Sequence, residues 1–196
     1  MSHRLAWATP PEWVAMVEAD PLAFLNDHAH CELKAAAMGQ SLIAKNPSFG
    51  MLIDTVPQVV LEEMQHFVQV NAELRKRGGE LGVQEPSPYA DGLHQGAAAT
   101  RTSLVLDRLV LAHLIEARSL ERFDLLANHL TDRTLAALYE ELLPSEAAHR
   151  GLFRKLAREA YGDAAEARIE TLGELESRLI AGLPFAHRVH SGIRVR

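Results

Sequence analysis

The sequence contains a single cysteine, Cys31, among its 196 residues. One cysteine cannot form a disulfide within the chain or build a cysteine-based metal site, and so sparse a use of cysteine fits a reducing compartment. No stretch approaches the run of about 18 apolar residues that indicates a membrane-spanning helix. Met1–Trp13 also lacks an apolar run of signal-peptide length. We therefore expect a cytoplasmic protein with no membrane segment.

Positive charge is scarce as well. The formal net charge is −6, which provides no overall attraction for nucleic acid, so a nucleic-acid site must rest on local basic patches. Glycine and proline are modest in number, and no alternating strand pattern or short-period repeat is present. Hydrophobic residues make up 47% of the chain, which is enough to bury a core. The composition indicates one folded domain over residues 1–196.

Apolar residues recur three and four positions apart in four long segments, as the helices of a bundle require. The predicted long helices cover about 20–44, about 51 or 55 to 77, about 100–128 and about 131–161, with further helices at about 12–18 and 163–181. Pro57 lies in the first turn of the second long helix or kinks it, and Pro144 bends the fourth. Residues 78–99, rich in glycine and proline, form the one long irregular connection and read as a crossover.

Two Glu-x-x-His motifs, Glu63–His66 and Glu146–His149, lie on the second and fourth long helices. Residues three apart share a helix face, so each motif presents a carboxylate and an imidazole to one metal ion. A single motif of this kind is expected by chance in a chain with 18 Glu and 10 His. Glu32 and Glu116, however, lie alone on the other two helices, 31 and 30 residues before the motifs. This is the ligand set of ferritin-like di-iron and di-manganese bundles.

All four glutamates occupy apolar seams, where leucine would be expected. Burying four unpaired carboxylates is prohibitive, whereas two divalent cations would neutralise them. Carboxylate and imidazole ligands suit iron, manganese or zinc, and two ions bridged by two carboxylates favour redox chemistry with dioxygen. The ligand set alone does not separate iron from manganese. The expected fold is all-α: a ferritin-like four-helix bundle with a long crossover between helix pairs, a short N-terminal helix and a C-terminal helix.

Other polar residues lie close to these motifs. Glu62 is about 100° around the helix from Glu63 and is assigned to solvent. His28 and His113, each one turn before a lone glutamate, are interpreted as core residues or as partners of the ligands rather than as ligands. Tyr139, two turns before the last motif, is interpreted as a packing residue, with a redox role as the alternative.

Beyond the ligand spacing, which all ferritin-like di-metal proteins share, most of the chain resembles the tRNA hydroxylase family known as MiaE. The stretches that carry the resemblance are Leu5–Pro10, Asp27–Ala36, Glu62–Phe67, Arg118–Phe123 and Ser145–His149. The resemblance implies a non-haem di-iron monooxygenase that uses dioxygen to hydroxylate the isopentenyl side chain of 2-methylthio-N6-isopentenyladenosine beside the tRNA anticodon. It also implies that Glu32 and His66 hold one iron, that Glu116 and His149 hold the other, and that Glu63 and Glu146 bridge them.

Such an enzyme needs an external electron donor, a reductase or a ferredoxin-type protein, and its RNA partner is the anticodon loop. If the last helix returns the chain to the end of the second long helix, the tail joins a basic cluster there and forms a surface for phosphate. The residues predicted for this surface are Arg75, Lys76, Arg77, Arg188, Arg194 and Arg196. Ordinary solvated cations at a helix end are the alternative interpretation.

Two other functions stay open at this point. One is a rubrerythrin-like peroxidase or a ferritin-like iron-handling protein that does not act on RNA; the lack of any Cys-x-x-Cys pair disfavours the first of these. The other is a non-catalytic RNA-binding bundle with a structural pair of metal ions. We expect a monomer or a small oligomer, whereas iron storage would require a large cage.

Overall fold

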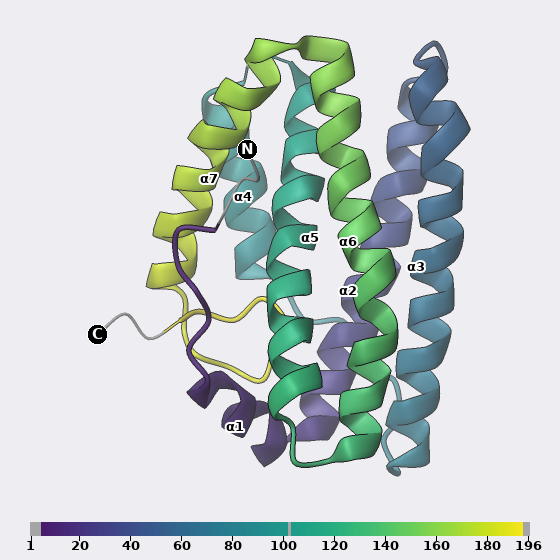
Figure 1. The fold of residues 1–196 in the computed structure, drawn as a ribbon, viewed down its shortest axis with the longest axis vertical. Coiled ribbons are helices and arrows are strands. Elements are labelled where there is room, and N and C mark those ends of the chain that lie inside the picture. Colours follow the sequence, from purple (N-terminus) through teal and green to yellow (C-terminus); the bar gives the residue numbers. More distant parts are fainter. Residues whose placement is uncertain (1–4, 102, 194–196) are drawn as a thin grey trace.

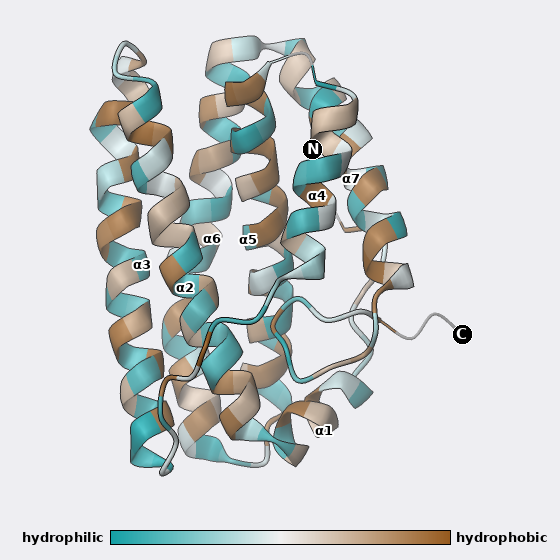
Figure 2. Cartoon of the chain, turned by 180° about the vertical axis from the view of Figure 1, so that it is seen from behind, coloured by the Kyte–Doolittle hydropathy of each residue, from teal (hydrophilic) through white to brown (hydrophobic). Residues whose placement is uncertain are grey.

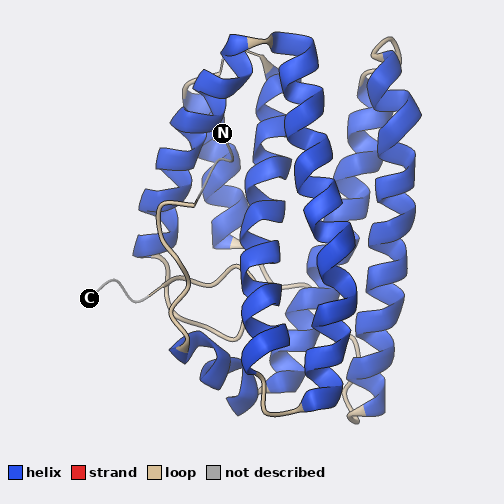
Figure 3. Cartoon of the chain, viewed as in Figure 1, coloured by secondary structure: helices blue, strands red, loops and turns tan. Residues whose placement is uncertain are grey.

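The computed structural model describes residues 5–101 and 103–193, which form seven helices and no strand (Figures 1 and 3). The helices are α1 (Glu12–Ala19), α2 (Pro21–Lys45), α3 (Gly50–Lys76), α4 (Pro88–Ala99), α5 (Leu104–His129), α6 (Arg133–Tyr161) and α7 (Asp163–Gly182). Within these residues, no helix is both long and apolar enough to cross a membrane.

Four long helices make an antiparallel bundle, as the sequence predicts. In Figure 1, α2 rises and α3 descends beside it, while α5 descends and α6 rises. The pairs α2–α3 and α5–α6 form the most extensive contacts, and α3 also packs on α6. The crossover after α3 therefore joins two helix pairs, and α4 and α7 cover α5 on the side away from α3.

Local sequence explains where these helices begin and end. The Asp20 side chain accepts the Ala23 N–H at the start of α2, and Asp132 accepts two N–H groups at the start of α6. Gly162, at φ +56°, joins α6 to α7 in a left-handed conformation that favours glycine.

Two details differ from the sequence expectations, and both concern the crossover. The stretch 78–99 is not irregular throughout, because Ser87 caps α4 and Pro88 begins it. α5 accordingly begins at Leu104 rather than near residue 100. Of the alternatives given for Pro57, the first turn is excluded, because α3 begins at Gly50, and Pro144 lies inside α6. Each of these helices is secured by tertiary packing, which overrides the local cost of proline and glycine.

The core is divided along the bundle. Two apolar clusters fill the two halves of the bundle. The first includes Leu52, Leu109 and Phe153, and the second includes Phe24 and Phe123. Along all four long helices, the candidate ligands lie between these two clusters in sequence. A layer of acids and histidines is therefore enclosed by apolar layers on both sides.

Candidate metal centre

Each long helix contributes to the polar layer as predicted. Glu32 comes from α2, Glu63 and His66 from α3, Glu116 from α5, and Glu146 and His149 from α6. All six side chains are buried, with exposed fractions between 1% and 6%. Two sets of ligand atoms lie within 4.8 Å of one another: Glu32, Glu63, His66 and Glu146 form the first, and Glu63, Glu116 and His149 form the second. Glu63 belongs to both sets.

The first set converges on one ring nitrogen of His66. Its Nδ1 lies 3.2 Å from Glu146 Oε1, 3.6 Å from Glu32 Oε2 and 3.7 Å from Glu63 Oε2. In the second set, His149 Nδ1 lies 3.0 Å from Glu63 Oε1. Both imidazoles therefore point Nδ1 toward the carboxylates.

The other ring nitrogen of each imidazole, Nε2, contacts a side chain that is not a candidate ligand. His66 Nε2 lies 2.9 Å from Ser145 Oγ, which in turn donates to the Leu142 carbonyl. His149 Nε2 lies 2.7 Å from Glu62 Oε2. Because Ser145 already donates its proton elsewhere and a carboxylate accepts, both Nε2 atoms act as N–H donors, which leaves each Nδ1 lone pair free for a metal ion.

The assignment of Glu62 to solvent was therefore wrong. Its side chain is 31% exposed, and its carboxylate reaches across from α3 to α6. A position one residue from a ligand faces away from the bundle axis, but a long side chain at the α3–α6 seam can still contact the neighbouring helix. Gln58 orients it, with Nε2 donating to Glu62 Oε1 at 2.9 Å.

His28 contacts a candidate ligand and belongs to neither set of ligand atoms. Its Nε2 lies 2.5 Å from Glu32 Oε1 and its Nδ1 lies 3.2 Å from Tyr139 Oη. Since the carboxylate accepts from Nε2–H, Nδ1 accepts from the tyrosine hydroxyl. Tyr139 is fully buried, so it packs in the core and also holds His28. His113 instead bonds through Nδ1 to the Arg150 carbonyl at 3.0 Å.

The buried atoms of this layer fit a metal centre. Glu63 Oε1, Glu146 Oε1 and the Nδ1 atoms of His66 and His149 are buried and have no hydrogen-bond partner. Their close contacts are not aligned as hydrogen bonds. Orphaned buried groups of this kind are rare in proteins, and here they all point to one region and are all of the types that bind iron, manganese or zinc.

Without a metal ion, the layer must hold protons. Burial, with the charges of Glu63 and Glu146 adding to it, raises the pKa of Glu116 well above its ordinary value. Burial disfavours the charged form of His66, but its carboxylate neighbours outweigh this and raise the pKa of the imidazole to about 12. The same balance raises the pKa of His149 to about 8. Burial disfavours the charged form of Glu32, but the hydrogen bond from His28 and the close contact with His66 outweigh it and lower the pKa to about 2.

The fold and the layer define a ferritin-like bundle with a buried carboxylate–histidine centre. A model of the family described as tRNA-(MS2IO6A)-hydroxylase (MiaE) matches residues 1–191. The chain belongs to this family, which confirms the resemblance read from the sequence.

Two relatives carry the name tRNA 2-(methylsulfanyl)-N(6)-isopentenyladenosine(37) hydroxylase. The one from Pseudomonas putida KT2440 is 39% identical over 191 residues, which cover 96% of this chain and 92% of that protein. The one from Salmonella typhimurium LT2 is 32% identical over 96% of this chain and 68% of that protein. Among solved structures, "Protein 43 with aldehyde deformylating oxygenase activity from Synechococcus" is similar, with a TM-score of 0.91 and 34% identity over 97% of each chain.

The structure describes four of the six basic residues predicted to bind RNA, namely Arg75, Lys76, Arg77 and Arg188. Arg75 is exposed at the end of α3, while Lys76 and Arg77 both pair with Glu73, and Arg77 also pairs with Asp132 at 2.7 Å. Arg188 lies beside the crossover, where it donates to the Pro86 carbonyl. Arg194 and Arg196 lie outside the described residues.

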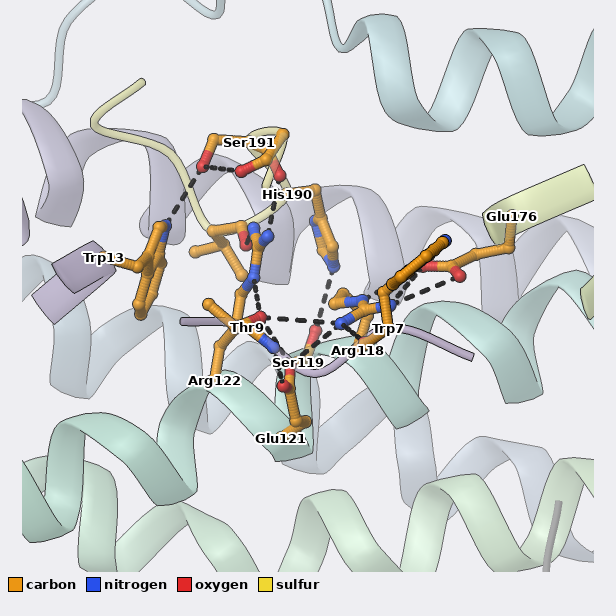
Figure 4. A network of polar contacts seen from close by, with 12 residues as sticks. Trp7, Thr9, Trp13, Arg118, Ser119, Glu121, Arg122, Glu176, His190 and Ser191 are labelled. Carbon is orange, nitrogen blue, oxygen red and sulfur yellow. Dashed lines mark hydrogen bonds and ion pairs between the residues drawn. The ribbon is translucent and has the colours of Figure 1, made fainter. Parts of the chain in front are cut away.

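Sequence reasoning missed a second buried polar cluster, drawn in Figure 4. Arg118 and Arg122 of α5 are fully buried. Arg118 contacts Glu176 of α7 at 3.0 Å, and Arg122 lies over the Trp13 ring with its guanidinium carbon 4.9 Å from the centroid. A signal was present, because Arg118–Phe123 is one of the stretches shared with the family, but its role is to bind α5 to α7 and to both terminal segments.

Proposed function

We propose that the protein is a non-haem di-iron monooxygenase that hydroxylates the isopentenyl side chain of 2-methylthio-N6-isopentenyladenosine beside the tRNA anticodon. Membership of the hydroxylase family supports the substrate and the reaction. The observation that carries the metal part is the pair of inward-facing, unpartnered Nδ1 atoms surrounded by four buried carboxylates.

In this proposal Glu32 and His66 would hold one iron and Glu116 and His149 the other, with Glu63 and Glu146 as the carboxylates shared between them. Bound there, the two irons would supply the activation of dioxygen that the C–H bond requires. One oxygen atom enters the C–H bond and the other leaves as water, so each turnover takes up two electrons and two protons. We propose that a reductase or a ferredoxin-type protein supplies the electrons.

The protein's own residues orient the ligands and exclude water. Ser145 and Glu62 fix the two imidazoles through their Nε2–H groups, and His28 fixes the carboxylate of Glu32. Apolar layers on both sides of the centre shield it from solvent. Such outer partners commonly change metal affinity or activity by about 10–100-fold when removed.

The decisive experiment is nucleoside mass spectrometry of tRNA from cells that lack the gene and are complemented with the wild type, Glu63→Ala or Glu146→Ala. We expect the hydroxylated nucleoside only with the wild type. The purified wild type should bind two irons per chain and consume dioxygen when reduced, and both variants should lose the paired site. The proposal would be contradicted if tRNA from cells complemented with the wild type lacked the hydroxylated nucleoside, or if both variants still bound two ions.

We also propose that the basic cluster predicted from the sequence contributes phosphate contacts. Charge reversal of Arg75, Lys76 and Arg77 should weaken tRNA binding and reduce its salt dependence, with metal content intact. Reversal of Arg178, an exposed arginine on α7, is the control. Unchanged affinity and salt slope in the triple variant would shift attention to the arginines of α6.

Both named relatives are tRNA hydroxylases, which gives no support to an iron-storage or peroxidase role. We propose a monomer or small oligomer in the cytoplasm, and size-exclusion chromatography separates this state from a storage cage.

A further inference from the structure

One cavity connects the outside of the bundle with the candidate metal centre. Its volume is about 120 Å³, and four of the six candidate ligands, Glu32, Glu63, Glu116 and Glu146, line it. It lies between α2, α4, α5 and the C-terminal segment, residues 183–193. We name it the α2–α4 pocket.

A larger groove of about 820 Å³ lies between the N-terminal segment, α5 and α6. It contacts none of the six candidate ligands, although Ala117 and Ala147 in its lining are their neighbours in sequence. Size alone therefore does not identify the route to the centre. Direct contact with the four carboxylates does.

The lining of the α2–α4 pocket changes from its inner to its outer end. The carboxylates at the inner end are buried, and Ala112 and Ile115 of α5 continue the wall with apolar surface. Lys34 of α2 is partly exposed at the outer end, and His94 of α4 is exposed there. In the part of the chain that the structure describes, Lys34 makes no ion pair within 4 Å. The pocket thus has apolar walls from Ala112 and Ile115, buried carboxylates at its metal-facing end and one lysine at its mouth.

We propose that the α2–α4 pocket admits the branched alkenyl side chain of the substrate nucleotide, with the adenine ring held at the mouth beside Lys34 and His94. The inference rests on the proposed function and locates its substrate. An alkenyl chain gains free energy from contact with the apolar walls at Ala112 and Ile115, and the C–H bond to be hydroxylated must reach the metal-facing end. A cation at the mouth suits the phosphates on either side of the base.

The C-terminal segment supplies one wall of this pocket. Its His190 ring stacks on Tyr89 with centroids 4.8 Å apart and planes 4° apart, and Nε2 lies 3.1 Å from Ser119 Oγ. Burial, with the charges of Arg122 and Arg118 adding to it, lowers the pKa of His190 to about 3, so the wall is uncharged. A neutral, flat ring is a surface on which an apolar chain can pack.

This wall is fixed by the second polar cluster. Arg122 donates to the carbonyls of Val189 and Ser191 on either side of His190, the second at 2.7 Å (Figure 4). Trp13 Nε1 donates to Ser191 Oγ at 3.0 Å. Figure 2 shows the crossover, α4 and the C-terminal segment gathered on one face of the bundle, and the Arg188 contact with Pro86 joins the crossover to the segment. The pocket is therefore a preformed feature of the folded chain.

The test places a large side chain at the outer end of the pocket and leaves all six candidate ligands unchanged. Ala90 of α4 lines the α2–α4 pocket, and Ala8 lines the larger groove, so Ala90→Phe and Ala8→Phe are matched variants. Binding is measured for two anticodon stem–loop RNAs, one with 2-methylthio-N6-isopentenyladenosine and one with plain adenosine, on iron-loaded protein without oxygen or reductant. We expect the wild type to bind the modified RNA on the order of tenfold or more tightly.

Ala90→Phe should bring this ratio close to one with metal content intact, and Ala8→Phe should leave it unchanged. Lys34→Glu should weaken the binding of both RNAs by the same factor and so preserve the ratio of their affinities. Ala35→Phe, on the opposite wall, replaces Ala90→Phe if thermal melting shows that the latter is unfolded.

Three results would overturn the inference while leaving the proposed function standing. They are a preserved ratio in a folded mouth variant, a ratio lost in Ala8→Phe, and a wild type that hydroxylates tRNA but binds both RNAs equally. A wild type that leaves cellular tRNA unmodified instead removes the proposed function and the inference with it.

Discussion

Replacing Glu62 with glutamine tests whether this partly exposed carboxylate holds His149, a candidate metal ligand. The bond between Glu62 Oε2 and His149 Nε2 is 2.7 Å long. A hydrogen bond to a charged group contributes about 1.5–3 kcal/mol. Because 31% of the Glu62 side chain is exposed and water competes for the bond, we take the lower end, about 1.5 kcal/mol. That corresponds to about a tenfold loss of affinity for the ion that His149 would bind.

The assay is metal titration of the metal-free protein by calorimetry. Wild-type protein should bind two ions, and Glu62→Gln should bind one ion with unchanged affinity and the other about tenfold more weakly. Glu141→Gln, an exposed glutamate on α6, is the control and should behave as the wild type. Wild-type affinity for both ions in Glu62→Gln would refute the argument, as would the loss of both.

The remaining predictions concern stability. In metal-free protein, the raised pKa of His149, about 8 against an ordinary 6.5, gives stability that is present below pH 6.5 and lost as pH rises through 8, on the order of 2 kcal/mol. The raised pKa of Glu116 acts in the same direction, so the melting temperature should fall from pH 6 to pH 9; a rise would contradict this. Arg118 is buried and pairs with Glu176 and also with the partly exposed Glu121, at 3.0 Å each. Glu176→Gln removes the buried carboxylate and should cost about 3 kcal/mol in urea unfolding, whereas an unchanged midpoint would show that Glu121 alone suffices. Tyr139→Phe removes one buried hydrogen bond and should cost about 1 kcal/mol with metal content unchanged; loss of metal would show a larger role.

Much of the centre is determined by local sequence because helix geometry is regular. Glu63 and His66 share one face of α3 wherever that helix packs. Their position in an apolar seam required that they be buried, and the fold buries both. The same reasoning placed Glu146 and His149 on α6. The one-dimensional period thus predicted the bundle, the buried layer and the residues within it.

Local sequence did not predict α4, which lies within the crossover. Pro88, Gly92 and Gly96 reduce intrinsic helix propensity, and the sequence favoured an irregular stretch. In the structure these glycines let α4 pack closely on α7: a Cβ on Gly96 would lie 2.4 Å from the Leu175 side chain, and one on Gly92 would lie 2.8 Å from Leu179. The helix exists because of a neighbour some 80 residues away in the chain, which a local pattern does not contain.

The sequence by itself determined the four long helices, their buried faces and the six acids and histidines that face one another, because helical period and burial are local properties. Tertiary structure alone decided which groups surround that layer. It brought Glu62 across to His149, paired the buried Glu176 with Arg118, and placed α4 and the C-terminal segment around the α2–α4 pocket. These contacts depend on the distance between helices and on the reach of long side chains, which are fixed only when the whole chain has packed.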